Sequence, residues 1–66
     1  LQIVSKLVDE ALMLNTKEIK ILHGKGNGIL RQMIRDYLKS VPGVLSYKDE
    51  KVEFGGTGIT VVNLDT

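Results

Sequence analysis

The stretch Ile19-Lys20-Ile21-Leu22-His23-Gly24-Lys25-Gly26-Asn27-Gly28-Ile29-Leu30-Arg31 decides the expected fold. Its first part is a short apolar run ending in His23, which predicts a buried strand, and apolar residues at helical spacing resume at Ile29. The three alternating glycines between them predict a tight loop at the carboxyl end of the strand. Ligands of open α/β sheets bind at this edge. A helix N-terminus there favours an anion, because its first N–H groups are unpaired.

Before this stretch, residues 1–14 carry apolar side chains at helical spacing and predict an amphipathic helix. Asn15 tolerates the left-handed conformation that closes helices, so we expect the helix to end there. No capping residue precedes the helix. We therefore expect the chain to begin inside a helix, with a preceding strand missing. The helix–strand–helix order predicts βαβ units and a largely parallel sheet.

After the loop, the spacing predicts a second helix that Asn27 caps and Pro42-Gly43 ends. A short strand is expected at Val44–Tyr47, and a β-branched strand at 59–64. Residues 52–54 fit either a brief strand or a loop, and 55–58 predict a flexible turn. The second helix should bury six side chains on one face: Ile29, Leu30, Met33, Ile34, Tyr37 and Leu38.

The composition indicates one small domain over residues 1–66 and excludes several classes of site. Cysteine is absent, so no disulfide or thiolate–metal site can form, and a single histidine argues against zinc. No apolar run reaches the roughly 18 residues of a membrane span, and no signal-peptide pattern is present. We therefore expect a cytoplasmic protein without membrane contact. The net charge is +1, but residues 17–39 carry +4, which places the positive charge around the glycine loop.

A local basic patch beside a glycine loop is typical of phosphate binding. Gly24, Gly26 and Gly28 would let backbone N–H groups approach a phosphate, with Lys25 and the capping Asn27 between them. This loop is neither a Walker loop nor a dinucleotide fingerprint. A tight turn that needs positive φ is the alternative explanation, but a turn rarely needs three glycines, and the lysine among them favours phosphate binding.

Arg31, Arg35 and Lys39 stand at i, i+4 and i+8, so they form one basic row on the second helix, with no acid at those spacings. The row predicts a track for successive phosphates; a solvated helix face is the alternative. His23 is a candidate catalytic or phosphate-contacting residue, with a hydrogen-bonded structural role as the alternative. The acidic residues show no spacing that singles out a metal pair.

The segment 23–31 closely resembles the Smr (small MutS-related) domain family. The resemblance continues through Ile34-Arg35, Tyr37-Leu38-Lys39 and 55–61, and it covers essentially the whole chain. It looks most like the C-terminal domain of bacterial MutS2 proteins. The resemblance implies a two-layer α/β sandwich of βαβαββ type, here without its first strand and the start of its first helix. The family's Leu-Asp-x-His or Leu-Asp-x-Arg motif is absent before the first helix.

The resemblance implies a nucleic-acid-binding endonuclease module, nicking DNA in MutS2-type proteins and cleaving RNA in others. It implies a larger, ATP-binding and homodimeric parent that suppresses recombination or acts in mismatch-repair-like DNA processing, with ribosome rescue in some bacteria. Mg²⁺ or Mn²⁺ is the expected cofactor for cleavage, and this chain is expected to bind without cleaving. The alternatives are a non-catalytic module that docks on ribosomal RNA or a protein partner, and a small-molecule phosphate binder.

Overall fold

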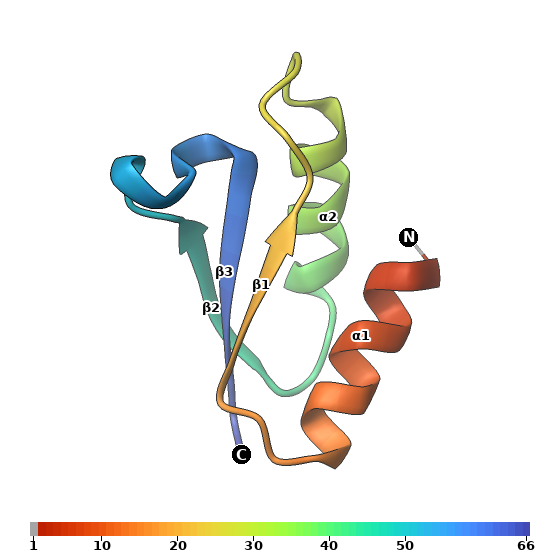
Figure 1. The fold of residues 1–66 in the computed structure, drawn as a ribbon. Helices are drawn as coiled ribbons and strands as arrows, with labels where there is room; N and C mark the ends of the chain where they lie inside the picture. Colours follow the sequence, from red (N-terminus) through yellow and green to blue (C-terminus); the bar gives the residue numbers. More distant parts are fainter. Residues whose placement is uncertain (1) are drawn as a thin grey trace.

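The computed structural model describes residues 2–66 as two helices packed on one face of a three-stranded sheet (Figure 1). In chain order the elements are α1 (Gln2–Met13), β1 (Glu18–Leu22), α2 (Ile29–Lys39), β2 (Val44–Asp49), two short 3₁₀ turns (Val52–Phe54 and Gly56–Gly58) and β3 (Ile59–Leu64). The expected two-layer α/β architecture is therefore confirmed.

The predicted strand direction is wrong for the strands that the structure describes. The sheet order is β1-β3-β2, and β3 runs antiparallel to both neighbours. Strands β1 and β2 point the same way and α2 connects them, so the βαβ unit exists, but β3 lies between its two strands (Figure 1). Strand β3 inserts between β1 and β2 and runs in the opposite direction. The order of helices and strands along the chain does not reveal this insertion.

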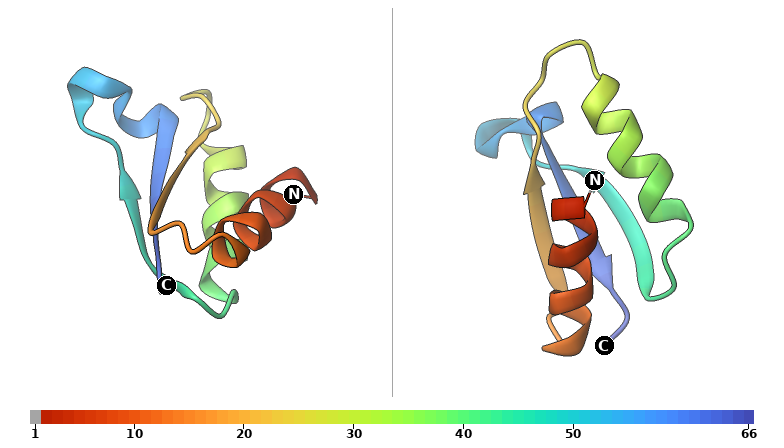
Figure 2. Two further views of the ribbon diagram at one scale, coloured as in Figure 1. Left: turned by 60° about the horizontal axis from the view of Figure 1, so that its bottom comes forward. Right: turned by 90° about the vertical axis from the view of Figure 1, so that its right-hand side faces the viewer.

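The core lies between the helices and one face of the sheet (Figure 2). Alternation along the strands directs every second side chain to this face. Its buried apolar members are Val8, Ala11, Ile21, Ile34, Leu38, Val62 and Leu64. Within residues 2–66, neither α1 nor α2 covers the opposite face of the sheet (Figure 2). None of the helices in residues 2–66 is long and apolar enough to cross a membrane.

Several local predictions need correction. Only the C-terminal half of the predicted α2 face is buried: Ile29, Leu30 and Met33 are 60%, 50% and 47% exposed, because the first turns of α2 run beside the glycine loop rather than over the core (Figure 1). Strand β2 extends two residues beyond the prediction to Asp49. Residues 52–54 form a 3₁₀ turn. The left-handed Asn15 after α1 is confirmed, with φ of 57°.

Candidate nucleic-acid interface

The glycine loop connects the carboxyl end of β1 to the N-terminus of α2 at one end of the sheet (Figure 1). Gly24, Gly26 and Gly28 have φ values of +81°, +38° and +82°, and a Cβ on any of them would meet no atom within 4 Å. The positive φ values therefore explain why glycine is needed at these positions, in agreement with the tight-turn interpretation. Close packing does not explain it, because a side chain at any of the three would have room. Gly28, rather than the predicted Asn27, is the N-cap of α2. The Asn27 side chain instead accepts a hydrogen bond from the Ile29 N–H at 3.2 Å.

The loop amides divide into an occupied group and an open group. The N–H groups of His23 and Gly24 both donate to the Gly58 carbonyl at 3.0 Å. The Gly24 N–H was predicted to approach a phosphate, but this hydrogen bond already occupies it. The following N–H groups, of Lys25, Gly26 and Asn27, donate no hydrogen bond within residues 2–66. The loop and the first turn of α2 enclose a small hollow of about 50 Å³, whose lining includes Lys25 and Arg31.

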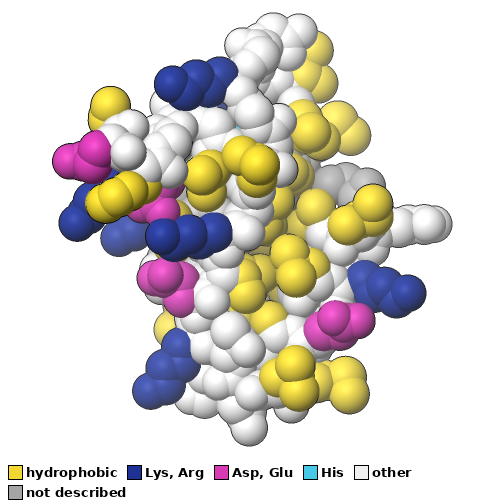
Figure 3. Space-filling model, viewed as in Figure 1, with side chains coloured by type: hydrophobic (Ala, Val, Ile, Leu, Met, Phe, Trp, Pro, Cys, Tyr) yellow, Lys and Arg dark blue, Asp and Glu magenta, His cyan; other side chains and the backbone are white. Residues whose placement is uncertain are grey.

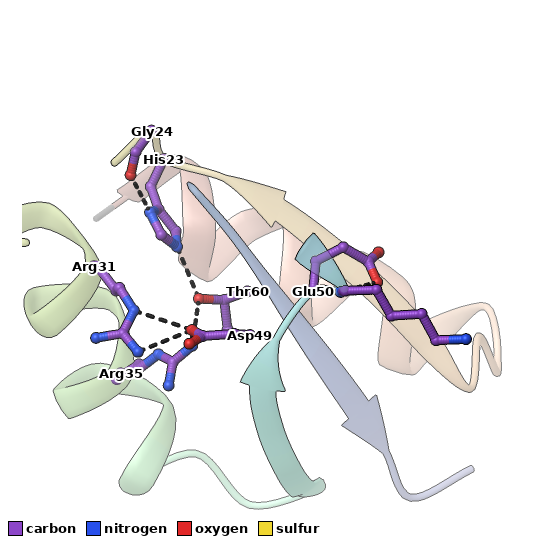
Figure 4. A network of polar contacts seen from close by, with 8 residues as sticks. His23, Gly24, Arg31, Arg35, Asp49, Glu50 and Thr60 are labelled. Atoms are coloured by element: carbon purple, nitrogen blue, oxygen red, sulfur yellow. Dashed lines mark hydrogen bonds and ion pairs between the residues drawn. The ribbon is translucent and has the colours of Figure 1, made fainter. Parts of the chain in front are cut away.

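The predicted basic row is not free of acids. Arg31 donates to Asp49 Oδ1 from Nε at 3.1 Å and from Nη2 at 2.8 Å. Arg35 donates to the same oxygen at 2.5 Å and lies over the Tyr47 ring, 5.5 Å from its centroid. The residue that neutralises both arginines comes from β2, so spacing on the helix alone could not reveal it (Figure 4).

Lys39 lies apart from this cluster. Its Nζ pairs with Asp36 Oδ1 at 3.5 Å, one helical turn back, and both side chains are about 60% exposed. Exposed pairs of this kind contribute little stability. The structure therefore brings Lys25 and Arg31 to the hollow, places Arg35 behind Arg31, and leaves Lys39 outside the cluster.

His23 is tied into the same network (Figure 4). Its Nδ1 lies 2.9 Å from the Gly24 carbonyl oxygen, and its Nε2 lies 2.8 Å from Thr60 Oγ1. Arg35 Nη2 donates to the same hydroxyl at 3.2 Å and also binds Asp49. Both ring nitrogens of His23 are hydrogen-bonded, which agrees with the structural role given above as the alternative to a catalytic one. In this arrangement neither nitrogen is free for proton transfer.

Two residues of this site, Thr60 and Asp49, have roles that the sequence pattern did not predict. Thr60 sits in a β-branched strand, and its one signal is that a polar residue shares a face with Val62 and Leu64. Asp49 is one of the acidic residues whose spacing indicated no role, and in the structure it pairs with the two arginines. In residues 2–66 no three histidine, cysteine or acidic side chains converge on a possible metal position. These residues therefore form no all-protein cage for a metal ion, and Mg²⁺ in particular is commonly held by one or two carboxylates together with water and substrate phosphates.

Two carboxylates have lowered pKa values for identifiable reasons. The hydrogen bond from Arg31 holds the pKa of Asp49 below its ordinary 3.8, although partial burial opposes this; the charges of Arg31 and Arg35 add to the lowering. On the uncovered face of the sheet, the hydrogen bond from Lys20, at 2.6 Å, lowers the pKa of Glu50 from 4.5. The folded chain thus binds protons at these acids less readily than the unfolded chain.

Acid should therefore destabilise the domain over a defined range. The ionised carboxylates stabilise the fold above their ordinary values, and this contribution disappears as the pH falls through the lowered folded values. The free energy of unfolding, measured by urea denaturation, should fall as the pH drops below 4.5 and then below 3.8, the ordinary values of Glu50 and Asp49. Asp49→Asn should flatten the lower part of this curve. A variant that follows the wild-type curve throughout would contradict the assignment to Asp49.

The chain is similar in sequence to several MutS2 proteins. Endonuclease MutS2 of Clostridium tetani is 49% identical over 59 residues, covering 89% of this chain and 8% of that protein. Endonuclease MutS2 of Helicobacter pylori is 36% identical over 64 residues, covering 97% and 8%. The chain thus spans about 8% of the length of these curated relatives.

Two solved structures share the fold. The Smr domain of Thermus thermophilus MutS2 superposes with a TM-score of 0.91 at 41% identity, covering 96% of this chain and 79% of that one. YdaL, a stand-alone small MutS-related protein from Escherichia coli, gives a TM-score of 0.86 at 25% identity, covering 92% and 51%. A family model described as the Smr domain matches residues 1–65, and the chain therefore belongs to the Smr domain family.

Proposed function

We propose that this Smr domain binds the phosphodiester backbone of nucleic acid at the glycine loop. The observation that carries the proposal is the set of unpartnered N–H groups at Lys25, Gly26 and Asn27, which lie beside the Lys25 and Arg31 side chains. Amide donors and cations together suit a phosphate oxygen. Contacts of this kind set affinity and position but read no sequence. DNA is the proposed ligand, with structured RNA as the alternative.

We further propose that the domain serves as the nucleic-acid-contacting module of a longer endonuclease. The support is the similarity to proteins named endonuclease MutS2, of whose length this chain spans 8%. Because no three metal-ligating side chains converge within residues 2–66 and both His23 nitrogens are hydrogen-bonded, we assign no cleavage step to these side chains. Binding without cleavage is the proposed activity of this chain by itself.

Lys25→Ala should weaken binding to branched or duplex DNA at low salt. Each phosphate contact contributes about 0.9 to the slope of log affinity against log salt concentration on B-DNA, so the slope should fall by roughly that amount. Fluorescence anisotropy titrations over a range of salt concentrations measure both quantities, with a structured RNA as a third ligand.

Lys17→Ala is the matched control, because Lys17 is also an exposed lysine but precedes β1, at the far end of that strand from the loop. The control should retain wild-type affinity and slope. Equal losses in the two variants would mean that overall charge governs binding, and the loop assignment would then fail. Competition by free nucleotides at equal phosphate concentration would point to a small-molecule phosphate site instead.

A protein-docking role is the second candidate, and exposed apolar side chains favour it. Ile29, Leu30 and Met33 lie uncovered on the first turns of α2, and hydrophobic side chains show along the helix side of the face in Figure 3. Met33→Gln would weaken the binding of a protein partner and leave DNA binding intact if this surface and the loop act separately, because Met33 does not line the hollow at the loop.

A further inference from the structure

Thr60 is a polar residue where the strand pattern calls for an apolar one. Its side chain is fully buried, and it shares the helix-covered face of β3 with Val62 and Leu64. In the sheet register it stands between Ile21 of β1 and Asp49 of β2. A buried hydroxyl is costly unless it is hydrogen-bonded. Thr60 meets this condition by joining His23 to Arg35 (Figure 4).

The directions of these hydrogen bonds follow from the chemistry of the partners. A carbonyl oxygen only accepts, so His23 Nδ1 carries the proton that it donates to Gly24. A guanidinium only donates, so Thr60 Oγ1 accepts from Arg35. In a neutral imidazole with its proton on Nδ1, Nε2 can only accept, so it accepts the hydroxyl proton of Thr60, 2.8 Å away. Of the two neutral tautomers of His23, the network therefore selects Nδ1–H.

We propose that Thr60 is a positioning residue for the glycine loop and acts through His23. The imidazole holds the Gly24 carbonyl from one side, while the Gly58 carbonyl holds the His23 and Gly24 N–H groups. The start of the loop is thus fixed, and the next three amides, at 25–27, are left without partners. Thr60 touches no ligand; its role is to keep His23 in the tautomer that binds the Gly24 carbonyl. The consequence for nucleic-acid affinity rests on the proposed function.

Thr60→Val removes the hydroxyl at nearly constant volume, and Thr60→Ser keeps it. Nitrogen-15 NMR at about pH 8.5, where histidine side chains are neutral, reports the tautomer directly. The wild type and Thr60→Ser should show Nδ1–H, with Nε2 as the acceptor. Thr60→Val should show a mixture of tautomers and shifted amide resonances at Lys25, Gly26 and Asn27. In the wild type alone, the Thr60 hydroxyl proton should exchange slowly and show cross-peaks to the His23 ring, a measurement that needs no variant to fold.

DNA affinity forms a separate arm. Thr60→Val should bind about two- to tenfold more weakly, the fold-change that corresponds to one hydrogen bond, and Thr60→Ser should recover wild-type affinity. Unchanged tautomer and loop resonances in Thr60→Val, or a rapidly exchanging hydroxyl in the wild type, would overturn the positioning role. A wild type that shows the expected NMR signature but binds neither DNA nor RNA would support the positioning role and refute the proposed function.

Discussion

Leu38→Ala should lower the free energy of unfolding by about 2–5 kcal/mol, the usual cost of emptying a fully buried leucine site. Leu38 is 1% exposed and belongs to the cluster that joins α2 to α1 and the sheet. A domain of this size has a total stability of roughly 3–10 kcal/mol, so the substitution should remove much of it. Urea denaturation followed by circular dichroism measures the change.

Leu45→Ala is the matched control for this prediction, because Leu45 is 67% exposed on β2. Surface substitutions of this kind change stability by about 0.5 kcal/mol or less. Similar losses in the two variants would mean that the core is not where the structure places it.

Asp49→Asn should tighten nucleic-acid binding while it destabilises the fold. The carboxylate neutralises Arg31 and Arg35, and Arg31 lines the hollow beside the loop. Without the charge, one or both guanidinium groups become available to phosphates. Each phosphate contact adds about 0.9 to the magnitude of the slope of log affinity against log salt concentration, so one or two new contacts should steepen this slope by roughly one to two. Anisotropy titrations against salt concentration test this, and the midpoint of urea denaturation should fall in the same variant.

Asp9→Asn provides the control with the same change in net charge. Asp9 lies on α1 and forms no ion pair with any residue of the described part of the chain. Its variant should retain the wild-type salt dependence. If both variants bind more tightly by the same factor, overall charge is responsible and the arginine cluster has no special role.

The helices, the strands and the loop were predictable from local patterns. Apolar periodicity defines α1 and α2, and β-branched residues define β3. The predicted apolar face of α2 was too long, because periodicity cannot show where the sheet stops covering a helix. The direction of the strands was not predictable in this way. The residues of β3 (59–64) carry no local signal that this strand inserts between β1 and β2 and runs antiparallel to both.

The site was only partly predictable, because its polar contacts connect residues far apart in the sequence. The glycine spacing located the loop, and the charge pattern found Arg31 and Arg35. Their shared acceptor, Asp49, is 18 and 14 residues away, beyond any spacing rule for one helix. Thr60 is 37 residues from His23, and a threonine in a β-branched strand gives no sign of a hydrogen-bonding role.

An NMR titration of the wild-type domain with branched DNA tests the phosphate-binding loop most directly. The account predicts that the largest changes in amide resonances occur at Lys25, Gly26 and Asn27. The Gly24 amide, which already donates to the Gly58 carbonyl, should change less. Maximal changes on the uncovered face of the sheet around Lys48 and Lys51, with the loop amides unmoved, would contradict it.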